Sequence, residues 1–442
     1  MGTHAQRQQR LTLLGHVSMR VTSIGFQAAL TLATGWACAP AEFGELVIIM
    51  AHGTVGATLC AGGALQGALR VAHLVAPGSA WQGPVLRLLV ASAIRRALLG
   101  AALVATALGL NPGVSVAGVA AGTAVMLAMT LASASSGFTI ARGQAPVNQA
   151  FDLFLRLPLQ AAGVAALYAT GHMSGPWLAT TAALAAAAHG GTLLARLPLR
   201  EARDRHVSRL MRVLLGRFVT SASANAVLFA ILTSLEVLLG SRLVAAAEIA
   251  PLGIAGRIAG ALAMLHGAVF DFHASSIAQS MRGQRGDETR ILLRMVALEA
   301  TALTLAAMLV SAAAVAMMPD TVPATFRMAV VPLWILLGAR LVTGALGPAP
   351  ALLTLRGQHT RLAMVTCAGI TVETVSVFAF AHNDGSIGLA MAAAAGIGTY
   401  SILARIYANS INTDRPSAPT TVPSVEPPKS RWAEAHPARE AE

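Results

Sequence analysis

The sequence predicts an all-α, polytopic membrane protein with about 12 transmembrane helices, arranged as two parallel six-helix repeats around a central cavity. Three observations predict this fold class: the composition, the recurrence of long apolar stretches, and short motifs that return in the second half. Hydrophobic residues make up 55% of the 442 positions and charged residues 11%, and the mean hydropathy is +0.65. A soluble domain with this composition could not cover its surface with polar groups, so we expect lipid to surround most of the chain.

Apolar stretches long enough to cross a bilayer recur from Leu11 almost to Ala408, with short polar segments between them. A helix needs about 20 apolar residues to span the hydrocarbon core. No small-residue cleavage site follows the first stretch, so we expect it to be a span and not a cleaved signal peptide. The predicted spans are residues 12–38, 44–69, 85–110, 113–141, 147–170, 174–197, 213–240, 247–279, 291–318, 324–354, 361–382 and 385–408.

Arginines concentrate before the first span and in every second loop after it. Short loops rich in Lys and Arg stay in the cytoplasm, which predicts that both termini are cytoplasmic. We assign the formal net charge of +12 to helix ends that face anionic membrane lipids, and not to a nucleic-acid partner. The opposite loops hold the acidic residues Glu42, Glu45, Glu248, Asp320 and Asp384 but few arginines, namely Arg242 and Arg327.

Three short motifs of the first half return in the second half, in the same order and at nearly the same offset. The motif at 41–44 returns at 247–250, the one at 142–144 at 356–358, and the one at 194–197 at 403–406. Because each half holds six predicted spans, the two copies would have the same orientation in the membrane. Such a pair leaves a central cavity that can open to either side, which is typical of alternating-access transporters.

This repeat divides the chain into four parts. We expect an N-terminal six-helix bundle at 1–200, a basic cytoplasmic linker at 201–212 and a C-terminal six-helix bundle at 213–409. The polar, proline-rich residues 410–442 are predicted to form a disordered cytoplasmic tail.

Motifs for covalent chemistry are absent from the sequence, so we expect no enzyme, no cofactor and no metal site. There is no GxxxxGK[ST] phosphate loop, no nucleophile elbow and no paired His or Cys spacing, and the single lysine is Lys429. The cysteines Cys38, Cys60 and Cys367 lie in apolar surroundings without CxxC spacing. A membrane-embedded polysaccharide polymerase stays an alternative, although such enzymes usually carry a large extracytoplasmic loop that this chain lacks.

Ionisable residues within the predicted spans are the candidate functional residues. Each costs on the order of 2.5–3.5 kcal/mol at a helix centre, so it is expected to face a cavity or a partner. Asp152 and Arg156 are four residues apart and can form an ion pair on one helix face. Glu236 and Arg257 form a possible anchor pair near the outer surface. The other candidates are Arg20, His266, Asp271, His273, Glu299, Arg340 and Glu373.

Several segments resemble polysaccharide (O-antigen type) flippases of the multidrug/oligosaccharidyl-lipid/polysaccharide (MOP) exporter superfamily. The similarity is clearest at 236–240, 246–250 and 255–258, which resemble that family's helices 7 and 8. Glu236 replaces the usual Asp, and Ala250-Pro251-Leu252 stands where that family has a G-x-Y turn. Further similar segments are 42–44, 352–358 and 385–390.

The resemblance implies a flippase that moves an undecaprenyl-diphosphate-linked oligosaccharide to the outer leaflet of a bacterial inner membrane. It implies that polysaccharide polymerase machinery is a possible partner. Buried arginines suit bidentate contacts with the diphosphate, which makes Arg20, Arg257 and Arg340 the candidate substrate-binding residues. The candidate ion-coupling residues are Glu236, Asp271 and Glu373.

Three other transporter classes are alternatives to this one, and each usually has a feature that this sequence lacks. A drug/cation antiporter of the same superfamily would favour a cavity rich in carboxylates and aromatic residues, and aromatic residues are 5% of this chain. A major-facilitator carrier usually has a G-x-x-x-D-R motif after its second helix, where this chain reads Arg70-Val71-Ala72-His73. A lipid II flippase has two more helices, for which we expect no room after Ala408.

Overall fold

The computed structural model describes residues 2–74, 82–141, 144–196, 223–282 and 286–410. This part of the chain is almost entirely helical and contains no strand. Nine of its helices are long and apolar enough to cross a membrane, and a shorter apolar helix covers Ser223–Leu232. The all-helical fold class is therefore confirmed, and the chain is a multi-pass membrane protein.

The first half of the chain follows the predicted spans closely. The second helix continues to Leu74, beyond the predicted end at residue 69, and the fifth predicted span contains a π-helical turn. The helices are α1 (Gly2–Ala37), α2 (Pro40–Leu74), α3 (Gln82–Gly109), α4 (Val116–Ala141), α5 (Ala145–Phe151), η1 (Asp152–Arg156), α6 (Leu157–Thr170) and α7 (Gly175–Ala195).

The second half departs from the predicted spans at Gly347 and at Thr233–Ser234, a turn that divides the described part of the predicted span 213–240. The predicted span 324–354 is two helices separated at Gly347, whose φ of 74° no helix interior accommodates. The predicted spans 361–382 and 385–408 are confirmed as two helical arms that fold back on each other at Gly385, whose φ of 51° and ψ of −125° are not helical. The helices are α9 (Leu235–Gly240), α10 (Ala246–Arg282), α11 (Gly286–Ala316), α12 (Ala324–Leu346), α13 (Ala349–Leu355) and α14 (His359–Ser410).

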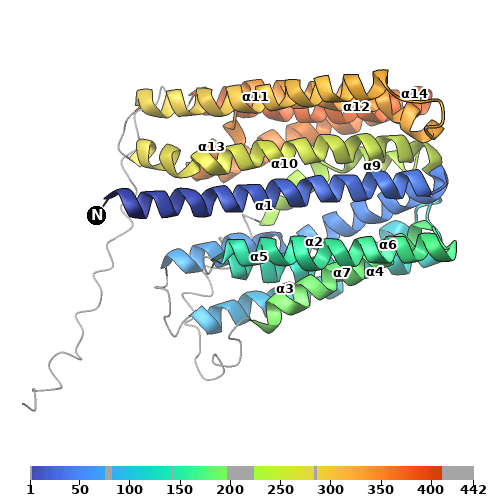
Figure 1. The fold of residues 1–442 in the computed structure, drawn as a ribbon, viewed down its shortest axis with the longest axis horizontal. Coiled ribbons are helices and arrows are strands. Elements are labelled where there is room, and N and C mark those ends of the chain that lie inside the picture. Colours follow the sequence, from blue (N-terminus) through green and yellow to red (C-terminus); the bar gives the residue numbers. More distant parts are fainter. Residues whose placement is uncertain (1, 75–81, 142–143, 197–222, 283–285, 411–442) are drawn as a thin grey trace, which may run out of the picture.

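The helices gather in two groups that follow the order of the chain, with α1 between them (Figure 1). In the first group α4 packs against α2 and α7, and in the second α12 packs against α10 and α14. Helix α1 packs both on α10 and on the continuous span formed by α5, η1 and α6. The predicted linker at 201–212 and, apart from Ser410, the predicted tail lie outside the described residues, so the four-part division stays a prediction.

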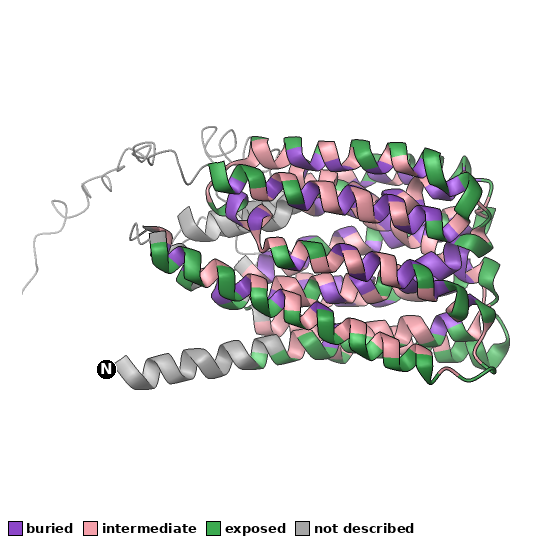
Figure 2. Ribbon diagram, turned by 90° about the horizontal axis from the view of Figure 1, so that it is seen from above, coloured by how far each residue is buried: buried purple, intermediate pink, exposed green. Residues whose placement is uncertain are grey.

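Large apolar side chains cover much of the outside of the bundle. On α3, Leu98 and Leu99 are 70% and 72% exposed, and on α11, Leu298 and Leu309 are 70% and 72% exposed. Buried positions face the inside of the helix groups, while exposed ones follow the outer faces (Figure 2). In water such a surface costs about 25 cal/mol per Å² of apolar area, so these faces are suited to lipid tails.

The two groups are held together at the end of the bundle opposite Gly2 and Ser410, which we call the far end. A Cβ atom at Gly44 would overlap the carbonyl oxygen of Ala246, so this glycine lets the start of α2 touch the start of α10. Nearby, the Asn111 side-chain amide donates a hydrogen bond to Ser241 Oγ at 2.7 Å. We call Gly44, Ala246, Asn111 and Ser241 the far-end seal, because they join the halves directly.

Candidate functional site

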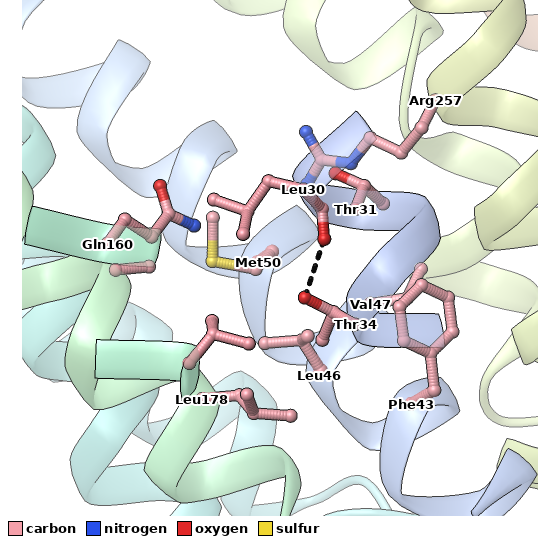
Figure 3. A pocket seen from close by; sticks show the side chains of 12 residues that line it. Leu30, Thr31, Thr34, Phe43, Leu46, Val47, Met50, Gln160, Leu178 and Arg257 are labelled. Atoms are coloured by element: carbon pink, nitrogen blue, oxygen red, sulfur yellow. Dashed lines mark hydrogen bonds between the residues drawn. The ribbon is translucent and has the colours of Figure 1, made fainter. Parts of the chain in front are cut away.

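A cavity lies among helices of the first half, at the side where α10 of the second half packs against them (Figure 3). Helices α1, α2, α6 and α7 line it, and Arg257 reaches into it from α10. Its polar lining residues are Thr31, Thr34, Gln160 and Arg257, and the others are apolar. Its volume of about 50 Å³ admits a few water molecules, so a larger ligand requires the two groups to move apart.

Arg257 is the cation that faces this cavity. Among the described residues its side chain has no hydrogen bond and no ion pair, and it is exposed in the isolated chain. Arg156, from the first half, lies close enough for the two positive charges to repel each other. Because Arg156 is itself paired with Asp152, the uncompensated positive charge in this region is that of Arg257, which favours an anion there.

Arg156 is held in place by a polar network at the π-helical turn. It forms an ion pair with Asp152, as the four-residue spacing predicted. Asp152 also accepts a hydrogen bond from Ser23 Oγ of α1 at 2.5 Å, and His189 Nδ1 of α7 lies 3.7 Å from it. Since π-helical turns are frequent at functional sites, this network is a candidate part of the site. It connects three helices of the first half beside the cavity.

Arg20 lies, like Arg257, where α1 packs against α10, but it is further from the far end. Its guanidinium is next to α10, where a Cβ atom at Gly267 would lie 3.7 Å from Arg20 Nη2. Gly267 and Arg257 are about 15 Å apart along the helix axis. Arg20 does not line the cavity. Arg20 and Arg257, two of the three predicted substrate-binding arginines, therefore lie at different depths along the contact between α1 and α10.

Arg340, the third predicted substrate-binding arginine, lies inside the second half. It interacts electrostatically with Glu236 of α9 and with His266 of α10, and it is not among the residues that line the cavity. The sequence had left open a pair between Glu236 and Arg257. The structure instead brings Glu236 together with Arg340.

Glu236 and Glu373 form a buried carboxylate pair beside Arg340. They come from α9 and from the first arm of α14, and they interact with each other electrostatically. Glu373 is fully buried, and neither of its carboxylate oxygens, nor Glu236 Oε2, has a hydrogen-bond partner in the described part of the chain. Gly396 makes room for this pair, because a Cβ atom there would lie 2.6 Å from Glu373 Oε2.

This arrangement has two carboxylates for one guanidinium. Two neighbouring carboxylates cannot both ionise at little cost, and a shared proton or a bound monovalent cation would offset the extra charge. Asp271, the third predicted coupling residue, belongs to α10, but its side chain lies outside the described part. In the described residues no cluster of three or more His, Cys, Asp or Glu side chains could hold a metal ion.

Two site residues escaped the sequence reasoning. Gln160 lines the cavity one helical turn after Arg156. Asp152, Arg156 and Gln160 follow one another at intervals of four residues, and this spacing could have indicated that they share a helix face. Gly44 lies in the repeated motif 41–44, but the sequence did not predict its contact with Ala246, because that contact depends on how two distant helices pack. Glu299, for which local pairing was one interpretation, lies 3.2 Å from His273 Nε2 on the neighbouring helix.

No family model and no curated protein matches the chain by sequence. Its fold, however, is similar to that of several solved membrane transporters. The lipid II flippase MurJ in an inward closed conformation has a TM-score of 0.63 at 10% identity, over 89% of this chain and 87% of that chain. An inward-facing multidrug resistance MATE family transporter of the MOP superfamily has a TM-score of 0.61 at 13% identity, and the match covers 90% of this chain and 98% of that chain. A MATE transporter in complex with MaL6 gives 0.59 at 13% identity, over 90% and 95%.

Proposed function

We propose that this protein is a flippase that carries an undecaprenyl-diphosphate-linked oligosaccharide across the bacterial inner membrane, for cell-surface or exopolysaccharide synthesis. The observation that carries the proposal is Arg257, a guanidinium without a described partner in the cavity, with the ion-paired Arg156 of the other half near it. A diphosphate can bridge two guanidinium groups through charge-assisted hydrogen bonds.

The same charges argue against a cationic drug as the substrate. Arg257 would repel a cation, the carboxylate of Asp152 is already paired with Arg156, and no carboxylate is among the residues that line the cavity. An isoprenoid diphosphate fits better, because its prenyl tail can remain in lipid while its anionic head enters between the halves. Arg20, on the path between α1 and α10, is our candidate for the first contact with the diphosphate.

Alternating access follows from the size of the cavity and from the far-end seal. With both termini in the cytoplasm, as the loop charges predict, the far end faces outward and the structure is closed on that side. Release of the substrate then requires Gly44 to leave Ala246 and Asn111 to leave Ser241. Polysaccharide polymerase machinery is the partner expected to receive the product.

We assign Glu236 and Glu373 to energy coupling, with Arg340 as their counter-charge. Replacing Glu373 by Gln removes the charge that a proton or monovalent cation would neutralise, so gradient-driven transport should fall at least tenfold. The measurement is transport into proteoliposomes under an imposed proton or sodium gradient. Glu299→Gln, a change at the partly exposed partner of His273, is the matched control and should retain coupling. Unchanged dependence on both gradients in Glu373→Gln would remove this assignment.

A reconstitution experiment tests the function itself. The purified full-length chain in proteoliposomes should move a fluorescent prenyl-diphosphate oligosaccharide between leaflets and leave a cationic dye in place. Movement of the dye without the lipid-linked sugar would instead establish the drug antiporter. Lengthening of the glycan by the purified chain would establish the polymerase alternative.

A further inference from the structure

Gln160 of α6 has an unused hydrogen-bonding group inside the cavity. Its carboxamide makes no hydrogen bond to any described residue, although it has both donors and an acceptor. The two cavity threonines are already engaged, since Thr31 donates to Gln27 O at 2.9 Å and Thr34 to Leu30 O at 2.7 Å. Among the lining residues, Gln160 and Arg257 are therefore the side chains with uncommitted N–H donors.

The position of Gln160 follows from its spacing along the helix. Arg156 and Gln160 are four residues apart and share a face, and Val164, one turn further, also lines the cavity. Gln160 and Arg257 approach the cavity from opposite sides, with Leu30 and Met50 between them (Figure 3). The backbone positions of Arg156 and Gln160 are thus about one turn, roughly 6 Å, apart along the helix axis.

The chemistry of a carboxamide restricts what it can bind here. A neutral amide adds little to phosphate binding beside two guanidinium groups, and it has no use for a prenyl tail. An amide that donates and accepts together matches a sugar hydroxyl or an acetamido group. The apolar side chains of Leu30 and Met50 next to it suit the less polar face of a sugar ring.

We propose that Gln160 recognises the sugar attached to the diphosphate, through hydrogen bonds to a hydroxyl or acetamido group of that sugar. This rests on the proposed function, in which Arg156 and Arg257 hold the diphosphate. Gln160 then selects among lipid-linked substrates, whereas the arginines bind the part that all of them share.

The test measures the affinity of the full-length chain for two probes, a prenyl diphosphate without sugar and the same prenyl diphosphate carrying N-acetylglucosamine. In the wild type the sugar should tighten binding about fivefold to fiftyfold, the range expected for one or two hydrogen bonds. In Gln160→Met, which keeps the length of the side chain, the ratio of the two affinities should fall to about one. Gln27→Met, at a glutamine of α1 outside the cavity lining, is the matched control and should keep the wild-type ratio.

The outcomes separate this inference from the proposed function. If neither probe binds the wild type, the proposed function fails. If both bind and the ratio in Gln160→Met equals the wild-type ratio, Gln160 does not read the sugar, although the flippase proposal stands. A uniform loss of affinity for both probes also overturns the inference, because it leaves the ratio unchanged. Should Gln160→Met not fold, Gln160→Asn, which withdraws the amide by one methylene, must lower the same ratio.

Discussion

Replacing Arg257 with alanine is expected to abolish detectable transport of the lipid-linked oligosaccharide while the protein still inserts and folds. The side chain has no described partner to lose, so its removal leaves no buried charge unpaired within the described structure. What is lost is the contact with the diphosphate. Each hydrogen bond to a charged group contributes about 1.5–3 kcal/mol, so loss of a bidentate contact should weaken binding by roughly two to four orders of magnitude.

Two further variants test whether the loss is specific to the guanidinium of Arg257. Arg257→Lys should recover part of the activity, because an ammonium keeps the charge but loses the two-pronged geometry of guanidinium. Arg327→Ala, at an exposed arginine near Asp320, is the matched control and should transport as the wild type does. Transport and the amount of folded protein have to be measured together. Normal transport by folded Arg257→Ala would show that this arginine is structural and would point to Arg20 and Arg156 as the phosphate ligands.

The second large effect is expected at the far-end seal, where Gly44→Val should prevent the halves from closing. Even a Cβ atom at this position would overlap the Ala246 carbonyl oxygen, and neither backbone can yield without separating α2 from α10. A transporter that cannot close its outer side cannot complete its cycle, so transport should fall to background. Cys38, half-buried in the adjacent turn, should at the same time react several times faster with a membrane-impermeant maleimide.

The control for this variant is Gly25→Val on α1, where an added Cβ atom meets nothing within 4 Å. It should keep both transport and slow labelling of Cys38, measured in a background without Cys60 and Cys367. Wild-type transport by Gly44→Val, or unaltered labelling of Cys38, would show that the contact between Gly44 and Ala246 is not needed for closure.

Much of the fold could be predicted because the local composition of a membrane helix largely determines where it forms. In lipid every backbone polar group has to be satisfied within the segment, so a sufficiently long apolar stretch becomes a helix almost regardless of its neighbours. The clearest error falls where a single residue overrides that rule, because Gly347 ends α12 inside a predicted span. The break predicted between two spans near Gly385 is confirmed, since the chain leaves the helical conformation there and folds back.

In the candidate site, too, contacts between residues close in the sequence could be predicted, and contacts between distant segments could not. The pair of Asp152 and Arg156 was predictable from the chain, because a spacing of four residues on a helix brings side chains together. Three other contacts were not predictable: Glu236 meets Glu373 and Arg340, Arg257 enters a cavity formed mainly by the other half, and Gly44 touches Ala246. Those contacts depend on the rotation and depth of each helix against its neighbours. They are set by packing between segments far apart in the chain, which local periodicity does not encode.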